Sequence, residues 1–393
     1  MPHDDALPDA RDPVALTAAL IRCPSVTPDE GGALTLLQRV LEPAGFTCHR
    51  MTFSEPGTPD VENLYARLGD SGPNLCFAGH TDVVPAGNLA AWTVPPFAAE
   101  ICDGVLYGRG AVDMKGGVAC FVAAAMRHLD RRGGKTGGSI SLLITGDEEG
   151  PSINGTSKVL DWLKARGERL DACLVGEPSN PEALGDEIKI GRRGSLNGEI
   201  LVQGIQGHAA YPQKADNPVP KLARIIDRLS TTVLDTGTDS FEPSRLVVTV
   251  IAVPNTATNV IPGAASAKFN IRYNDLWNRP RMEARISEIA AAAAAEVGAR
   301  YELSFSGTGD VFLTEAGPLV DTMVAAVMAE TQRTPALTTG GGTSDARFIK
   351  DHCPVIEFGL VNRTIHQIDE HVAVSDLETL TRIYEQFIAR YFA

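Results

Sequence analysis

Short apolar runs typical of buried strands alternate along the first half of the chain with longer segments of helical spacing. Strand-like runs occupy residues 63–68, 75–78, 139–145 and 172–175. Helical spacing of apolar residues is found at residues 13–21, 33–41, 115–129 and 157–165. Strands that alternate with helices favour parallel pairing in a sheet that the helices cover. We therefore predict an α/β fold, layered as α/β/α.

The pattern changes after Gly185 and then returns. Longer strands are predicted at residues 195–202, 245–253 and 267–273, with helices at 218–230 and 280–297. Two such strand-and-helix units predict a small α+β (ferredoxin-like) domain with an antiparallel sheet and one exposed face. The α/β pattern then resumes with helices at residues 318–331, 344–350 and 375–391 and a strand at 355–358.

A chain of 393 residues exceeds the length at which one core usually stops growing, so we expect two domains. They either follow one another or the smaller is inserted into the larger. Motifs that carry chemistry lie on both sides of the α+β segment, which favours insertion. The expected boundaries give a first part at residues 1–192, an inserted domain at 193–306 and a second part at 307–393.

Charge and composition exclude several classes of protein. The formal net charge of −14 argues against non-specific nucleic-acid binding, although local arginines can still bind an anionic small molecule. No apolar run approaches the length of a membrane span, and the N-terminus lacks the features of a secretory signal. The cysteines are scattered and never spaced Cys-x-x-Cys, which argues against a disulfide framework or a thiolate zinc site. A reducing cytoplasm fits best.

His80 and Asp82 follow the strand-like run at residues 75–78. Residues two apart on a strand project to the same side. His80 can therefore offer one ring nitrogen to a metal while Asp82 accepts a hydrogen bond from the other. Alone, a His-x-Asp pair is also common at an ordinary polar strand end.

Further acidic residues and a second histidine occur in segments marked by glycine or proline. They are Asp113 in segment 108–117, Glu148 and Glu149 in 145–150, Glu177 in 174–179 and His366 in 362–370. Each alone has an ordinary explanation, such as a helix N-cap or a solvated loop. Together, at the strand ends where open α/β sheets bind ligands, they form the donor mix that suits zinc without thiolates. A carboxylate shared by two ions is typical of two-metal hydrolases.

Four of these motifs, at residues 79–85, 108–116, 147–150 and 176–179, resemble those of the di-zinc amidohydrolases and exopeptidases. That family includes aminoacylase, acetylornithine deacetylase and carboxypeptidases. Motifs at residues 188–198, 207–218 and 341–348 narrow the resemblance to members that act on a succinylated diamino acid. The resemblance implies zinc-dependent hydrolysis of the amide bond of N-succinyl-LL-2,6-diaminopimelate to succinate and LL-2,6-diaminopimelate, in lysine and diaminopimelate biosynthesis.

The resemblance also implies roles for residues at the matching positions. Asp113 becomes the carboxylate that bridges two zinc ions, with cobalt possible in the second site. His80 and Glu177 complete one site, and Glu149 and His366 complete the other. Glu148 becomes the general base and acid, which takes a proton from the water between the metals and delivers it to the leaving amine, while Asp82 orients His80. A cis peptide bond is implied between Asp113 and Met114.

At the substrate, the resemblance implies a set of binding residues: Arg192, Ser195, Tyr211, Asn259, Arg272, Gly342, Thr343 and Asn362. Arg272 lies on the polar side of its strand and can offer a bidentate fork to a carboxylate. The inserted domain becomes a lid and dimerisation domain. His208 would then reach the active site of the partner in a homodimer and stabilise the oxyanion. Gln213 stands where many relatives have histidine, which leaves only local contacts in doubt.

Two alternatives remain open at this point. One is acetylornithine deacetylase or a broad aminoacylase, which the arginine pair, Ser195 and segment 341–344 argue against, because an acetyl group has no carboxylate to bind. The other is a non-catalytic relative that binds a metal or a peptide. The complete set of five ligands together with Glu148 argues against it.

Overall fold

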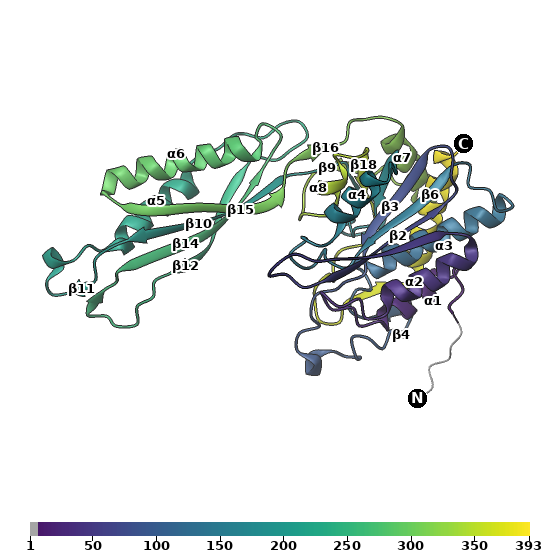
Figure 1. Cartoon of the computed structure of the whole chain (residues 1–393), viewed down its shortest axis with the longest axis horizontal. Coiled ribbons are helices and arrows are strands. Elements are labelled where there is room, and N and C mark those ends of the chain that lie inside the picture. The colour runs from purple at the N-terminus through teal and green to yellow at the C-terminus, as the bar shows by residue number, and fades with distance from the viewer. Residues whose placement is uncertain (1–6) are drawn as a thin grey trace. The chain divides into compact units, whose positions relative to one another are not determined.

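The structure is a computed structural model that describes residues 7–393, except for the side chain of Thr308 (Figure 1). The chain divides into two compact units. The larger unit runs up to Ile190 and also includes Thr314–Thr338 and Ser344–Ala393. The smaller unit consists of Gly191–Leu313 and the short segment Thr339–Thr343. Each unit has an apolar core of its own.

The larger unit is built on a mixed β-sheet. Its strands, in order across the sheet, are β1 (Thr47–Phe53), β2 (Val61–Leu68), β6 (Ser139–Thr145), β3 (Asn74–His80), β7 (Ala172–Val175), β18 (Val355–Glu357), β8 (Glu187–Lys189) and β17 (Ala336–Thr338). The central strands β6, β3, β7 and β18 pair in parallel, whereas β1, β2 and β6 are joined by antiparallel pairing. Strands β3, β6 and β7 are buried along their whole length, as expected where both faces are covered.

Helices cover both faces of this sheet. One layer contains α1 (Pro13–Ile21), α2 (Ala33–Leu41), α3 (Lys115–Arg131), α7 (Pro318–Thr331) and α9 (Val374–Tyr391). Its core includes Phe77 of β3, whose ring stacks on that of Phe121 of α3 with 4.3 Å between centroids. The opposite face carries α4 (Thr156–Ala165) and the short α8 (Ala346–Ile349). The predicted α/β/α layering is confirmed.

A small sheet joins two loops of the larger unit. It consists of β4 (Glu100–Cys102), β5 (Val105–Tyr107) and β19 (His371–Ala373). Tyr107 at the end of β5 pairs with His371 at the start of β19. Residues 108–113 follow β5 and residues 362–370 precede β19. The antiparallel pairing therefore brings these two segments side by side.

The smaller unit has an antiparallel sheet with helices on one face. Its strands, in order, are β12 (Arg245–Ala252), β14 (Ala264–Tyr273), β10 (Gly194–Gln203) and β15 (Arg300–Gly309). Helices α5 (Pro218–Thr231) and α6 (Arg279–Val297) pack on it. Phe269, Ile271 and Tyr273 are buried in this core, and residues between them point to the other face. The predicted alternation along this strand is confirmed.

Two short ladders mark the two ends of β10 in the smaller unit (Figure 1). The pair β9 (Gly191–Arg192) and β16 (Phe312–Leu313) lies where β10 begins. The pair β11 (Gly207–His208) and β13 (Val260–Ile261) lies where β10 ends. Since β10 has 10 residues, these two ladders are roughly 30 Å apart.

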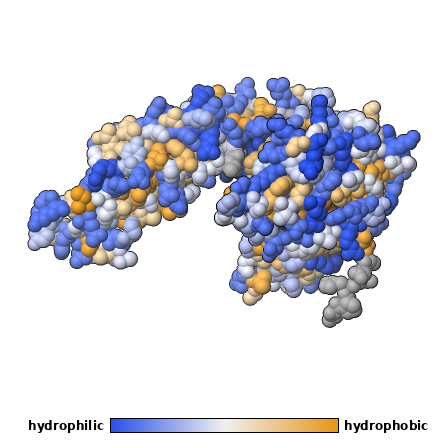
Figure 2. All heavy atoms as spheres, in the orientation of Figure 1, coloured by the Kyte–Doolittle hydropathy of each residue, from blue (hydrophilic) through white to orange (hydrophobic). Residues whose placement is uncertain are grey.

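Among the described residues, no helix is both long and apolar enough to cross a bilayer. Polar residues cover most of the face drawn in Figure 2, and apolar residues are scattered among them. Scattered apolar residues of this kind are ordinary on a protein surface.

Candidate metal centre

Parallel strands bring the predicted ligands to one edge of the larger unit's sheet. His80 is the last residue of β3, Glu149 follows the end of β6, and Glu177 follows the end of β7. Because β6, β3 and β7 are adjacent and parallel, their carboxyl ends meet. Asp113 stands just before α3, and the peptide bond to Met114 is cis. His366 comes from the loop before β19.

Asp113 occupies the middle of this group. Its Oδ1 lies 3.1 Å from Nε2 of His80, and its Oδ2 lies 3.3 Å from Nε2 of His366. Glu177 Oε1 is 3.9 Å from the same nitrogen of His80. Glu149 Oε1 is 2.8 Å from Nε2 of His366. Two groups of side chains able to hold a metal ion therefore share the carboxylate of Asp113. Each group uses a different oxygen of that carboxylate.

The donor set fits a pair of divalent transition metal ions. Each group offers one imidazole nitrogen and two carboxylates, with atoms within 4.8 Å of one another. Imidazole and carboxylate together suit zinc and similar ions, and a shared carboxylate suits two of them. A third group, formed by His80, Glu148 and Glu149, overlaps the first two.

Electrostatics indicates that this cluster needs positive charge. Burial, with Asp113 and Glu148 nearby, raises the pKa of Glu177 well above its usual value. Hydrogen bonds to Asp113 and Glu149 raise the pKa of His366 to about 10. Burial lowers the pKa of His80, but contact with Asp113 and Glu177 outweighs it and the net shift is upward. In the metal-free protein, protonated His80 and His366 therefore provide the positive charge that bound metal ions would otherwise provide.

Burial raises the pKa of Glu148 to about 8, and the neighbouring carboxylates Asp345 and Glu149 add to the rise. A carboxyl group with a pKa near neutrality can both accept and return a proton at physiological pH. Glu148 and Glu149 are consecutive, and only Glu149 contacts His366. This separation leaves Glu148 available for proton transfer.

Asp82 contacts His80 in a different way from that expected. Nδ1 of His80 lies 2.8 Å from the backbone oxygen of Asp82, while the nearest carboxylate oxygen is 3.6 Å away. The carboxylate instead accepts hydrogen bonds from the backbone amides of Glu148 and Glu149, at 3.3 and 3.0 Å, and from Thr27 Oγ1 at 2.6 Å. The chain leaves β3 after His80, so the side chain of Asp82 turns toward the Glu148–Glu149 segment.

Most of the predicted substrate residues lie in the smaller unit, in two separate groups. Near β9, Arg192 Nη1 donates to the carbonyl oxygens of Gly340 and Gly342 at 3.1 and 3.0 Å. Arg272 Nη1 donates to Thr343 Oγ1 at 3.2 Å, and Ser195 is its partner across β10 and β14. Arg192, Ser195, Arg272, Gly342 and Thr343 therefore gather at one end of the sheet.

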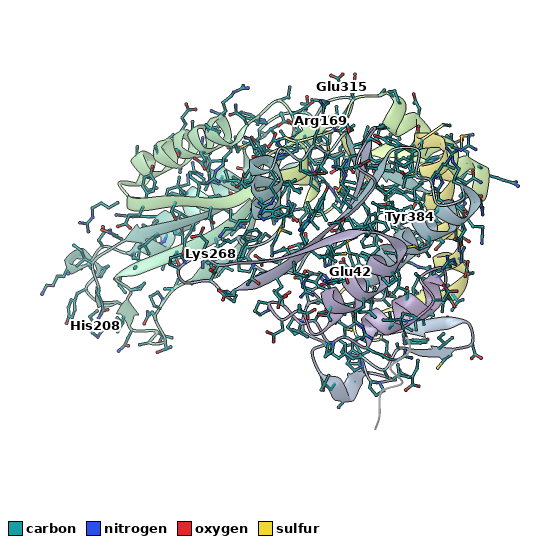
Figure 3. All side chains as sticks on the ribbon, turned by 45° about the vertical axis from the view of Figure 1, so that its right-hand side comes forward. Glu42, Arg169, His208, Lys268, Glu315 and Tyr384 are labelled. Carbon is teal, nitrogen blue, oxygen red and sulfur yellow. The ribbon has the colours of Figure 1, made fainter. Side chains whose placement is uncertain are left out.

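The second group surrounds β11 at the other end. The rings of His208 and Tyr211 are 5.7 Å apart, and the amide of Ala209 donates to the carbonyl oxygen of Asn259 at 2.9 Å. Figure 3 shows His208 at this end of the smaller unit. The last predicted residue, Asn362, lies in the larger unit, where its amide donates to Asn180. The positions of the predicted substrate residues in the sequence did not show that they would fall into separate groups in the structure.

Two residues near Glu148 went unassigned in the sequence. Thr27 contacts Asp82, as described above, and no motif marks it. Asp345 is buried and accepts a hydrogen bond of 2.6 Å from Thr156 Oγ1. Asp345 lies in the glycine-rich motif at residues 341–348. An acidic residue in that motif could have marked it as a candidate site residue.

Comparison with known proteins places the chain in a family. A model described as peptidase family M20/M25/M40 matches residues 76–390. The chain belongs to this family. The M20/M25/M40 assignment confirms the resemblance that the motifs predicted.

Relatives within the family include proteins named succinyl-diaminopimelate desuccinylase. The one from Rhodospirillum centenum is 61% identical over 384 residues, which cover 98% of each chain. The one from Methylorubrum populi is 59% identical over 384 residues, which cover 98% of this chain and 99% of the relative.

Solved structures share the fold at lower identity. The aminopeptidase PepT of Bacillus cereus has a TM-score of 0.78 at 21% identity, over 98% of this chain and 99% of that one. The metallo-carboxypeptidase Sso-CP2 of Sulfolobus solfataricus has a TM-score of 0.77 at 18% identity, over 97% and 99%. The YXEP protein of Bacillus subtilis, described as a dinuclear metal-binding peptidase, has a TM-score of 0.71 at 17% identity, over 99% of each chain. These likenesses confirm the predicted fold class.

Proposed function

We propose that the protein hydrolyses the amide bond of N-succinyl-LL-2,6-diaminopimelate to succinate and LL-2,6-diaminopimelate, with two zinc ions per subunit. The observation that carries the chemistry is the position of Asp113, which presents one carboxylate oxygen to His80 and the other to His366. The substrate follows from the relatives at 61% and 59% identity over nearly the whole chain. The proposal includes a role in lysine and diaminopimelate biosynthesis, which fits a cytoplasmic enzyme.

Each residue of the centre has a defined task in this proposal. His80, Asp113 and Glu177 hold one ion, and Asp113, Glu149 and His366 hold the other, where cobalt can substitute. When bound, the two ions polarise the amide carbonyl and lower the pKa of water. Glu148 accepts the proton of the attacking water and returns it to the leaving amine.

The substrate contacts follow the resemblance. We assign Arg192, Arg272, Ser195, Gly342 and Thr343 to the succinyl end, where two guanidinium groups supply the positive charge that a carboxylate requires. Tyr211, Asn259 and Asn362 complete the set. In this proposal the larger unit is the catalytic domain, and the smaller unit is a lid and dimerisation domain.

A homodimer explains the two separate groups in the smaller unit. His208 and Arg192 are roughly 30 Å apart along β10, so one small substrate cannot contact both in the same subunit. We propose that His208 reaches the active site of the partner subunit and stabilises the oxyanion. Strand β12, at the edge of the sheet, exposes Val247 and Ile251 at 58% and 60%, which suits pairing with a second copy.

A substrate panel tests the proposal. Metal-free protein is reconstituted with zinc and assayed with N-succinyl-LL-2,6-diaminopimelate, N-acetylornithine and N-acetyl amino acids. The first should give the highest kcat/KM, and chelation should abolish activity until zinc is restored. A preference for N-acetylornithine would overturn the substrate. Protein that takes up no zinc would overturn the proposal and favour a non-catalytic relative.

The role of Glu148 is tested by the Glu148→Ala variant. Removal of a general base typically costs about 10²–10⁴-fold in rate, and we expect a loss of kcat in this range. The matched control is Glu315→Ala, at an exposed glutamate of the same unit that Figure 3 labels. Full activity in Glu148→Ala would show that another group acts as the base.

A further inference from the structure

Glu370 joins the segment that carries Asp113 to the loop that carries His366. It is fully buried, at 0% exposure. Its Oε1 accepts hydrogen bonds from the backbone amides of Val112 and Asp113, at 2.9 and 3.1 Å. Its Oε2 accepts from the amide of Gly110 at 2.9 Å and from Arg109 Nη1 at 2.8 Å. One carboxylate thus binds four donors of residues 109–113.

The backbone of Glu370 adds to this attachment. Its carbonyl oxygen accepts a hydrogen bond of 2.9 Å from the amide of Gly108. The pairing of β5 with β19 lies directly beside it. The Asp113 segment is therefore held along most of its length by a single residue from the other segment.

Arg109 extends the attachment to a third segment of the chain, the one that follows His80. It is 2% exposed, and its Nη2 lies 3.5 Å from the carbonyl oxygens of both His366 and Pro85. Pro85 belongs to the segment that follows His80. The guanidinium group also lies over the ring of Trp92, 5.4 Å from its centroid. A buried ion pair of this kind is costly to break, because the remaining charge stays buried without its partner.

The backbone of the His366 loop shows why such an attachment is needed. His366 and Asp369 have positive φ angles of 60° and 58°, a region that non-glycine residues seldom adopt. Backbone in such a conformation persists only when its surroundings hold it there. The side chain of Asp369 accepts two hydrogen bonds of 2.7 Å from the amide and the hydroxyl of Thr93. Glu370 is the next residue, and its contacts with residues 109–113 hold the same loop.

We propose that Glu370, paired with Arg109, is a positioning residue that sets the separation of Asp113 and His366. It thereby determines how tightly the metal ion held by Asp113, Glu149 and His366 binds. This proposal rests on the proposed two-metal function. His80 and Glu177 extend from β3 and β7, which the main sheet holds in place. Glu149 extends from the end of β6. Loss of Glu370 should therefore weaken the ion held by Asp113, Glu149 and His366 more than the ion held by Asp113, His80 and Glu177.

The test is a metal titration of the Glu370→Gln variant. Both oxygens of Glu370 face N–H donors, so the amide group of glutamine meets a donor in either orientation. Metal-free protein is titrated with zinc against a competing chelator, and both dissociation constants are measured. We expect one to stay nearly unchanged and the other to rise by about 10–100-fold, the usual effect of losing a residue that supports a metal ligand.

Two further variants separate positioning from loss of stability. Glu385→Gln alters another buried glutamate of the same unit, which lies 2.7 Å from Arg131. It should lower Tm but change neither dissociation constant. Arg109→Lys keeps the charge beside Glu370 and loses the contact with the His366 carbonyl oxygen. It should weaken the same ion as Glu370→Gln, by a smaller factor, and provides the answer if Glu370→Gln does not fold.

The outcomes of the titration are distinct. Unsubstituted protein that binds no zinc would overturn the proposed function itself. Unsubstituted protein that binds two ions, with unchanged constants in Glu370→Gln, would overturn the positioning role and leave the function standing. Equal weakening of both ions, together with a fall in Tm like that of Glu385→Gln, would also overturn it, because that is the effect of general destabilisation.

Discussion

Asp82 connects the proposed metal ligands to the proposed base through the backbone. Its carbonyl oxygen lies against His80, and its carboxylate holds the amides of Glu148 and Glu149. These are separate groups of one residue. A side-chain substitution removes the second contact and keeps the first, so the two effects can be measured apart.

We predict that Asp82→Ala keeps zinc and loses turnover. The contact between the backbone oxygen and His80 remains, whereas the Glu148 segment loses its anchor. A displacement of about 1 Å at a catalytic group can cost about 10²-fold in rate, and kcat should fall by this order. Zinc content is measured by atomic emission and kcat on the same samples. Thr27→Val, which removes one hydrogen bond to Asp82, should give a smaller loss. Loss of zinc in parallel with kcat would contradict this division.

A second prediction at this scale concerns pH. The pKa of His366 is raised from 6.5 to about 10 in the metal-free protein by Asp113 and Glu149. The proton on His366 therefore stabilises the metal-free fold fully below pH 6.5, and this contribution is lost as the pH rises through about 10. A metal ion must displace that proton, so zinc affinity should rise by about tenfold per pH unit between pH 6.5 and 8.5.

Calorimetric titration in buffers of different ionisation enthalpy measures the proton released with each ion. We expect release with the ion bound by His366. The control is His366→Asn, in which this pH dependence should shrink. Zinc affinity independent of pH would contradict the raised pKa.

At the residue scale, the sequence singled out side chains that the structure brings together. His80, Asp113, Glu149, Glu177 and His366 were candidates from their glycine- and proline-marked segments, the family resemblance named them as ligands, and the structure places them close to one another. Their roles as ligands remain a prediction. The backbone acceptor at His80 and the attachment at Glu370 escaped notice, because backbone carbonyl groups carry no sequence signal and Glu370 reads as one more acidic residue in a loop.

At the scale of elements, the long periodic segments were predictable and the outer strands were not. Helices α1, α2 and α7 and strands β6 and β7 have the predicted bounds. Strand β1, Thr47–Phe53, was missed because it lies at the edge of its sheet and buries only Met51 fully. Strand β15 was also missed, although Tyr301, Leu303 and Phe305 alternate along it. Edge strands bury little apolar surface, so periodicity identifies them poorly.

The exposed edge strand β12 carries a prediction. Val247→Lys places a charge on the edge that we propose for dimerisation, and it should shift the protein from dimer to monomer in sedimentation velocity. Activity should fall with the dimer fraction. Val233→Lys is the matched control, because Val233 is 75% exposed in the same unit and lies outside β12. A Val247→Lys protein that remains dimeric would show that another surface is used.

At the scale of the whole molecule, the chain forms two units with separate cores, and each holds different predicted functional residues. The five proposed ligands and Glu148 lie in the larger unit, and His208 lies in the smaller one. If His208 serves the partner subunit, Glu148 and His208 of one chain belong to different sites of the dimer.

Mixed dimers of Glu148→Ala and His208→Ala chains test this arrangement. Each variant alone should have low activity. Unfolding and refolding an equal mixture should yield mixed dimers in which one site has an intact Glu148 and receives an intact His208. Random assembly gives about half mixed dimers with one active site each, so activity should recover to about a quarter of the unsubstituted value. Two variants refolded separately and then combined are the control. No recovery in the mixture would place His208 in its own subunit's site, whereas full activity of His208→Ala alone would place it outside catalysis.

The length of strand β10 also limits how the sequence can change in evolution. It separates Arg192 from His208 by a fixed rise per residue, so each residue added to the strand would move one group by about 3.3 Å and turn the following side chains to the opposite face. Two added residues would restore the facing but leave a displacement of about 7 Å. Loops of the smaller unit can vary in length without this effect. A change in the length of β10, in contrast, would occur in both copies of a homodimer and would displace His208 from both of the proposed shared sites.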